Sequence, residues 1–119
     1  VAVIRVGAAT EVEMIEKRHR IEDALEAVKS AQQEGILAGG GVSLVRASQK
    51  LKLKTGGAHI VREAILEPVR QMARNAGDSP DVVVEKICKS KGSRGWNFAK
   101  GKMMDMFDEG VVDPFKVTR

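Results

Sequence analysis

Residues 10–35 read TEVEMIEKRHRIEDALEAVKSAQQEG, and this stretch decides the fold class. A Thr-x-x-Glu capping box at Thr10 predicts that a helix begins near Glu11, because the hydroxyl and the carboxylate each satisfy a free backbone amide. The helix can continue to about Gln33, and Gly35 then ends it. One helix of this length in a chain of 119 residues predicts a mainly α-helical protein.

The apolar residues of this helix form a narrow stripe on a highly charged surface. On a helical wheel, the stripe residues fall within about 40° of Met14; they are Met14, Ile21, Leu25 and Val28. Such a helix suits a strut between domains better than a core element. Asp23 lies on the opposite face, about 180° from Met14. A solvated carboxylate is the ordinary interpretation there, and a carboxylate presented to something outside the helix is the functional one.

Three glycines follow the long helix, at positions 39–41, and lead into the apolar sequence Val42-Ser43-Leu44-Val45. Glycines that open a helix allow close approach of the backbone, and the free N–H groups there favour phosphate. The pattern is not a Walker A motif, because no Gly-Lys-Ser/Thr follows it. Tight packing or a helix C-terminal turn explains the triplet at least as often.

Further helices are expected in the middle of the chain. One begins at about Ala58 and is broken or kinked at Pro68, because proline lacks an amide donor and clashes with the preceding turn. A second covers residues 69–76 and stops at Gly77. Ser79-Pro80 then supplies an N-cap followed by proline at the first position of another helix.

The two ends of the chain carry weaker signals. Residues 1–6 are rich in β-branched side chains and predict one short strand. Glycines between residues 90 and 101 predict a loop or small hairpin near 95–101, and residues 103–109 predict a short helix. Asp113-Pro114 resembles an N-cap followed by proline. A lone strand and a terminal helix of five residues are unstable alone, which predicts a piece of a larger protein.

The composition is that of one globular domain, with 43% hydrophobic and 30% charged residues. All four aromatic residues lie after residue 95, so the first ninety residues pack through aliphatic side chains, which favours helices. The single cysteine, Cys88, excludes an internal disulfide and a cysteine-based zinc site, and two distant histidines predict no metal cluster. No apolar run approaches the roughly 18 residues of a membrane span, so no membrane partner is expected.

The net charge of +4 permits contact with phosphate without proving it. The alternative to a larger assembly is a small basic helical module that binds nucleic acid through Arg46, Lys50, Lys52 and Lys54. A solvated helix end and loop is the more ordinary explanation of these residues. No aromatic side chain lies nearby to stack on bases, so no nucleic-acid partner is expected.

Taken together, several stretches resemble group I chaperonins of the GroEL type, and the resemblance runs through the whole chain in order. They are residues 1–7 (VAVIRVG), 8–11 (AATE), 20–25 (RIEDAL), 34–35 (EG), 38–41 (AGGG) and 113–117 (DPFKV). The resemblance implies that residues 1–33 are the returning segment of an intermediate domain. Residues 34–119 are then part of an equatorial, ATP-binding domain, without its final helices. The first half of the phosphate site and its magnesium-binding aspartate lie outside this chain.

The resemblance also implies roles for six residues. Asp23 matches the carboxylate that the intermediate helix brings to ATP to orient or activate the attacking water. The expected nucleotide-binding residues are Gly40 against the nucleotide, Asn97, Phe98 and Ala99 beside the adenine, and Asp113 near the ribose. No metal ligand is expected among them, and Mg²⁺ is expected to be held by the missing half.

The implied protein is an ATP-dependent chaperone in the bacterial cytoplasm. Its expected partners are identical subunits in a heptameric ring, a co-chaperonin lid and unfolded client proteins. The 119-residue chain alone is expected to hydrolyse no ATP. The chain departs from this family at Phe98, where alanine is usual, and at Trp96, where tyrosine is common. Two further departures predict altered contact between rings: residues 51–57 are a shortened stretch, and Ser79 stands where an acidic residue is frequent.

Overall fold

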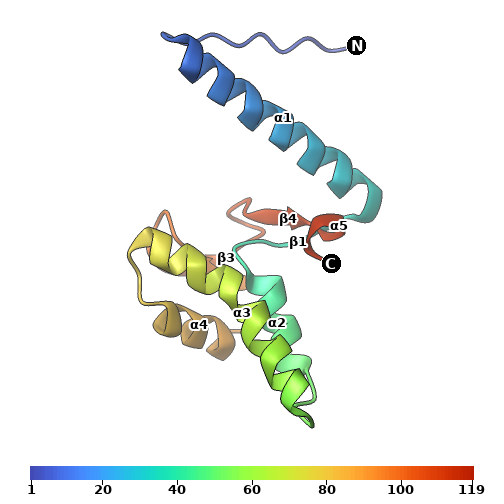
Figure 1. Cartoon of the computed structure of the whole chain (residues 1–119), viewed down its shortest axis with the longest axis vertical. Helices are drawn as coiled ribbons and strands as arrows, with labels where there is room; N and C mark the ends of the chain where they lie inside the picture. The colour runs from blue at the N-terminus through green and yellow to red at the C-terminus, as the bar shows by residue number, and fades with distance from the viewer.

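The computed structural model describes all 119 residues and contains five helices and two small antiparallel sheets (Figure 1). The elements are α1 (Glu11–Glu34), β1 (Ile36–Ala38), α2 (Val42–Lys50), α3 (Gly56–Ala76), α4 (Pro80–Lys89), β2 (Arg94–Asn97), β3 (Lys102–Asp105), β4 (Val112–Pro114) and α5 (Phe115–Thr118). The predicted mainly α-helical fold is confirmed. No helix has the length and apolar character needed to cross a membrane.

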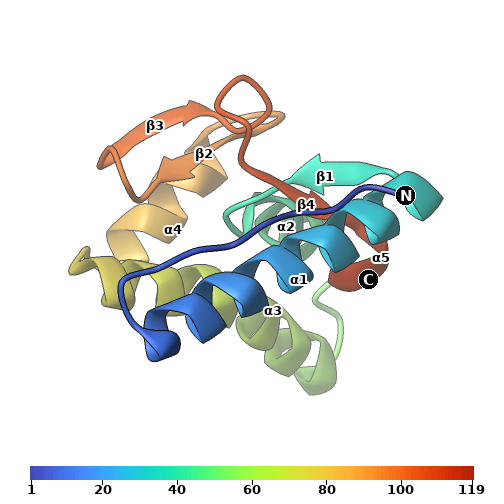
Figure 2. The ribbon, with the colours of Figure 1, turned by 90° about the horizontal axis from the view of Figure 1, so that it is seen from above.

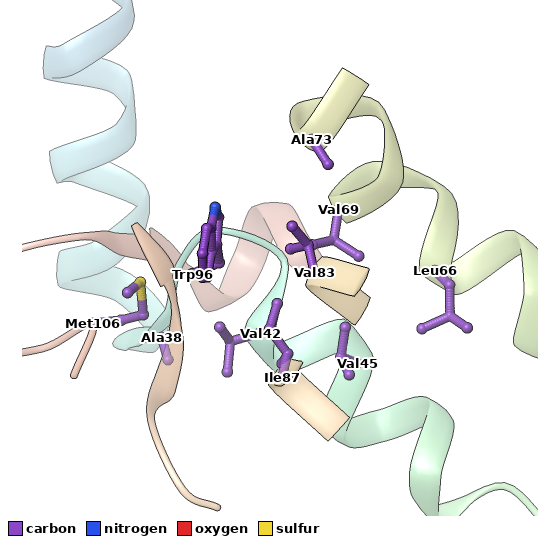
Figure 3. Packing of buried hydrophobic residues seen from close by; sticks show 10 residues of the cluster. All are labelled: Ala38, Val42, Val45, Leu66, Val69, Ala73, Val83, Ile87, Trp96 and Met106. Atoms are coloured by element: carbon purple, nitrogen blue, oxygen red, sulfur yellow. The ribbon is translucent and has the colours of Figure 1, made fainter. Parts of the chain in front are cut away.

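The core lies where α2, α3 and α4 meet the β2–β3 hairpin (Figure 3). Most of its side chains are aliphatic, and Trp96 is the one aromatic residue among them; the cluster is Ala38, Val42, Val45, Leu66, Val69, Ala73, Val83, Ile87, Trp96 and Met106. The Trp96 indole nitrogen donates a hydrogen bond to Asp78 at 2.8 Å, which satisfies its one polar atom. This core fixes the hairpin against the helices.

Each small sheet joins two parts of the chain. Strands β1 and β4 pair antiparallel, with Leu37 opposite Asp113, and so bring the end of the chain to the segment that follows α1. Strands β2 and β3 form a hairpin with Trp96 opposite Met103. The hairpin predicted near residues 95–101 is confirmed, and its strands extend to residues 94 and 105.

Helix α1 projects from the rest of the molecule (Figure 1) and contains no buried residue. The predicted cap is present, since Thr10 accepts a hydrogen bond from the Glu13 amide at 3.2 Å. Near the other end of the helix, Lys116 reaches Gln33 at 2.6 Å and Arg119 pairs with Glu34 at 3.0 Å. The expectation of a strut, rather than a core helix, therefore fits the structure.

Residues 1–6 form no strand, so that prediction was wrong. They lead away from the start of α1 at an angle (Figure 1), line a hollow together with that helix, and make no backbone hydrogen bond. A strand exists only where a second strand supplies the other half of the ladder. This chain contains no such partner for residues 1–6, and their β-branched composition alone does not create one.

Of the two outcomes predicted at Pro68, a break or a kink, the break does not occur. Helix α3 continues through Pro68 for 21 residues, from the Thr55 cap to Gly77. Leu66 and Val69, on either side of the proline, are buried against α2 and α4, while Pro68 itself is exposed. Packing on both sides therefore holds the two halves in one helix despite the missing amide donor.

Two predictions near the C-terminus need correction. Residues 103–109 are not a helix, because residues 102–105 complete the hairpin and a turn follows. Asp113 does not cap a helix. It lies in strand β4, and α5 begins only at Phe115. Pairing with β1 therefore overrides the local signal of Asp113-Pro114.

Candidate functional site

The glycine turn between β1 and α2 is the centre of the candidate site. The Gly39 amide donates to the Val111 carbonyl at 2.9 Å, and a Cβ atom at Gly39 would lie 3.0 Å from the Val111 carbonyl carbon. Gly40 and Gly41 have φ values of +63° and +75°, which favour glycine. Gly39 is therefore needed for close packing, Gly40 for its backbone conformation, and Gly41 for both.

The amide groups of Gly40 and Gly41 make no hydrogen bond within the chain. Both lie immediately before α2, whose N-terminal end carries a partial positive charge. A Cβ atom at Gly40 would meet nothing closer than the Met106 sulfur at 3.6 Å. This turn therefore offers two backbone donors that have no partner within the chain, which is one requirement of a site for an anionic ligand group.

Two other predicted segments approach the same turn. Asp113 is half-buried in β4, opposite Leu37, and the same strand pair ends at the bond between Gly39 and Val111. On another side, the Trp96 carbonyl oxygen lies 3.8 Å from the position that a Cβ atom of Gly40 would take. The structure thus brings Gly40, Asp113 and the start of the 97–99 segment around one turn.

Asn97 is buried, and its side chain is largely used inside the hairpin. Its Oδ1 accepts hydrogen bonds from the amides of Ala99 and Lys100 at 3.0 and 3.1 Å. Its Nδ2 donates to Glu109 at 3.3 Å. These contacts shape the turn that carries the predicted adenine-side segment, so the amide of Asn97 has little capacity left for a ligand.

The other two residues of that segment differ in exposure. Phe98 is half-buried and packs against the core cluster, while Ala99 is exposed in the turn. Phe98 is therefore held in place by the protein itself. The predicted contact of these residues with adenine stays a prediction.

Asp23 lies apart from the other predicted residues. It is exposed on α1 and forms no hydrogen bond or ion pair in the structure. The part of α1 that lines a hollow with strands β1 and β4 contains Ala27, Val28 and Ala31, beginning one helical turn after Asp23. Asp23 therefore lies on the projecting part of α1, one turn before the part that faces β1 and β4. The structure does not bring it to the glycine turn.

Sequence reasoning missed the role of Arg46, which ties α2 to the loop after α4. Its guanidinium donates to the carbonyl groups of Ile87 at 2.8 Å, Gly92 at 3.0 Å and Arg94 at 3.1 Å, and to the Ser90 hydroxyl at 2.8 Å. These bonds cap the C-terminal end of α4 and anchor the hairpin. Arg46 is thus engaged within the chain, which removes a member of the basic cluster considered for nucleic acid.

Gly95 was also missed. A Cβ atom there would overlap with Val42 at the start of α2, so the hairpin backbone lies directly on that helix. The available signal was a glycine between Arg94 and Trp96 inside a strand, which indicates a close approach of backbone to another element.

The structure contains no group of three or more His, Cys, Asp or Glu residues placed to hold a metal ion. The donors at the glycine turn are amides, which suit an anion and cannot bind a cation. The turn therefore fits the phosphate or sugar side of a nucleotide, and Mg²⁺ would need ligands from outside these residues.

Comparison of this chain with known protein families and solved structures identifies the class of protein. The model of the TCP-1/cpn60 chaperonin family matches residues 1–119, and the chain therefore belongs to this family. The crystal structure of a group III chaperonin in the open state is similar to this chain, with a TM-score of 0.78 and 30% sequence identity. The match covers 95% of this chain and 26% of the group III chain, so the present chain spans about a quarter of that relative. Nothing in the family match or the structure supports the nucleic-acid alternative.

Proposed function

We propose that this chain is part of an ATP-dependent chaperone that encapsulates non-native proteins and assists their folding. The observation that carries the proposal is the glycine turn, with its two free amides beside Asp113 and the hairpin, in a chain of the chaperonin family. In this proposal, residues 1–33 belong to the intermediate domain and residues 34–119 to the equatorial domain. The projecting α1 and the separate core of α2–α4 support that division.

The proposed site uses each segment differently. The Gly40 and Gly41 amides hold an anionic or sugar group, and Asp113 accepts hydrogen bonds from ribose hydroxyls. The turn shaped by Asn97 supports the adenine side through Phe98 and Ala99. ATP with Mg²⁺ supplies the phosphoryl group for hydrolysis, and the Mg²⁺ ligands come from the part of the protein outside this chain.

Asp23 is the proposed catalytic residue. A carboxylate that orients or activates water typically contributes 10²–10⁴-fold to such a reaction. In the structure Asp23 is exposed and unpaired, so its carboxylate is available to a ligand when α1 moves toward the body. Movement of a helix about a short connection is a common means of completing an active site.

The test is Asp23→Ala in the complete protein. We expect nucleotide affinity to be retained and ATP turnover to fall by about 10²-fold or more, because only water activation is lost. Glu16→Ala is the matched control, since Glu16 lies two turns away on the same face of α1 and should leave turnover unchanged. Unchanged turnover in Asp23→Ala contradicts the catalytic role, and lost nucleotide binding assigns Asp23 to ligand holding instead.

The 119-residue chain alone should hydrolyse no ATP, because half of the proposed phosphate site is outside it. Magnesium-dependent turnover by the purified chain would contradict this. We further propose a heptameric ring with a co-chaperonin lid in the bacterial cytoplasm, as in GroEL-type chaperonins. Native mass spectrometry of the complete protein distinguishes seven subunits from fourteen and from other ring sizes.

A further inference from the structure

A second charged feature lies on the other side of the hairpin from the glycine turn. Between residues 86 and 102 the chain has six lysines and arginines and no carboxylate. Four of the six line one hollow of about 470 Å³, together with Ser90 and Met103; the four are Lys86, Lys89, Lys91 and Arg94. We call this feature the basic hollow.

The hollow is built from α4, the loop after it and the hairpin. Trp96 and Met103 are opposite each other in β2 and β3, and Lys86 lies over the Trp96 ring at 4.2 Å from its centre. Arg94 is two residues before Trp96, so the two side chains share a face of the strand. The hairpin lies beside α4 in Figure 2, and β2 contacts that helix.

The local charge is positive even when the nearby carboxylates are counted. Glu85 pairs with Lys89 at 2.6 Å, and Asp105 is opposite Arg94 in the hairpin. Asp105 is itself held by Ser93 and two backbone amides. Asp78 accepts a hydrogen bond from the indole of Trp96, over which Lys86 lies. Four cations therefore face three carboxylates, and Lys91 forms no ion pair with any of them.

The chemistry of the walls favours phosphate over a peptide. Met103 is the one apolar residue among the six that line the hollow. The Ser90 hydroxyl already donates to Ile87, and the carbonyl of Arg94 is already bonded to Arg46. A peptide would find little apolar surface and few backbone partners here, whereas a compact multivalent anion needs only the charges.

We propose that the basic hollow binds an oligophosphate group, which is a linear anion with several phosphate charges. Two to four lysine and arginine side chains can surround such a group without any further partner. The site is separate from the glycine turn, since the hairpin lies between them: the Trp96 carbonyl is near Gly40, while the ring of the same residue underlies Lys86. It does not depend on the function proposed above.

The probe is inorganic tripolyphosphate, titrated at low ionic strength into the 119-residue chain and followed by calorimetry and amide NMR. The site variant is Lys89→Gln/Lys91→Gln/Arg94→Gln. The control variant is Lys50→Gln/Lys52→Gln/Lys54→Gln, which removes the same charge from exposed residues elsewhere. We expect the site variant to bind about tenfold more weakly and the control to bind as the parent chain does.

Equal weakening in both variants, or no binding at millimolar probe, would overturn the proposal. Equal affinity of hexaglutamate, with the same dependence on the site variant, would also overturn it and identify an acidic-peptide surface. Circular dichroism checks that the variants fold. If the triple variant unfolds, Lys91→Glu alone replaces it, because Lys91 is exposed and its reversal should weaken binding of the probe.

Discussion

Gly41 lies so close to α3 that a side chain has no room. A Cβ atom there would be 2.9 Å from the Val69 Cβ, and φ is +75°. Gly41→Ala should therefore lower the free energy of unfolding by about 2 kcal/mol or more, from backbone strain and overpacking together. Urea denaturation of the purified chain measures this loss.

Two other glycines separate the contributions. Gly40→Ala has the strained φ but only ordinary contacts, so about 1 kcal/mol is expected. Gly57→Ala lies in the first turn of α3 with nothing within 4 Å, and it should be neutral or slightly stabilising. We expect the loss in free energy of unfolding to be largest for Gly41→Ala, smaller for Gly40→Ala and smallest for Gly57→Ala. Equal losses for Gly57→Ala and Gly41→Ala would contradict this order.

Asp105 gives the fold a dependence on acid. A hydrogen bond from Ser93, with smaller contributions from the amides of Asp108 and Phe107, lowers the pKa of Asp105 below its ordinary value of 3.8. Because the folded pKa is below the unfolded one, this stabilisation is complete above about pH 4 and is lost as the pH falls through the folded pKa. Ser93→Ala should raise the pKa of Asp105 and reduce this acid-dependent loss.

NMR titration of the Asp105 carboxyl carbon measures the shift directly. Ser79→Ala is the control, because Ser79 is exposed and distant in sequence from the hairpin. An Asp105 pKa that is the same in the parent chain and in Ser93→Ala would show that the hydroxyl is not the cause.

At the scale of elements, Arg46 connects α2 to the end of α4. Arg46→Met removes donors to four acceptors, Ile87, Ser90, Gly92 and Arg94. The Gly92 carbonyl loses its partner in the chain, whereas the carbonyl groups of Ile87 and Arg94 keep their bonds to Ser90. We expect a loss of about 2–3 kcal/mol in the free energy of unfolding, as for hydrogen bonds to a charged group. Amide exchange in residues 88–94 should also become faster, since these bonds anchor the loop.

The control is Lys50→Met, in the same helix and exposed. It removes a positive charge without removing a cap and should change the stability by less than about 0.5 kcal/mol. Equal effects of the two variants would mean that charge, and not capping, explains the loss.

The helix starts that the sequence predicted correctly are those with local signals at the N-terminal end. Thr10 and Glu13 fix the start of α1. At α4, Pro80 takes the first helical position as predicted, although the Ser79 hydroxyl makes no capping hydrogen bond. These signals act within one turn, so neighbouring residues contain the whole of the interaction. Helix boundaries could therefore be read without knowledge of the rest of the fold.

The incorrect predictions share a dependence on distant residues. Asp113-Pro114 pairs with a strand some 75 residues earlier in the chain, and Pro68 stays helical because of Leu66 and Val69. The site shows the same division. The glycine turn is visible as a triplet in the sequence, whereas the contacts of Arg46 with residues 87–94 require the packed structure.

For the whole molecule, the radius of gyration is 16.9 Å, against about 13.5 Å for a compact domain of this length. The projecting α1 and the extended residues that precede it both lie outside the compact part of the molecule (Figure 1). Since α1 has no buried residue and isolated helices are marginal in water, its amides should exchange at least about tenfold faster than those of α3. Hydrogen exchange followed by mass spectrometry measures both helices in one sample.

Helix α3 provides the internal control, because its Leu66, Val69 and Ala73 are buried in the core. Equal protection of α1 and α3 would mean that α1 is covered in solution, for example by a second copy of the chain. Apolar residues of α1 that are exposed, including Met14 and Leu25, are the surface that such a copy would cover. Association of this kind would appear as a molecular mass in solution that rises with protein concentration.

The attachment of α1 at one end also acts as a mechanical amplifier. Its 24 residues make a rod about 36 Å long. A tilt of about 20° about its base would sweep the free tip through about 12 Å and carry Asp23, roughly halfway along, through about 6 Å. A small change of angle at the Arg119–Glu34 ion pair would thus move the Asp23 carboxylate by several ångströms. Removal of that ion pair would loosen the attachment of α1 without changing the helix itself.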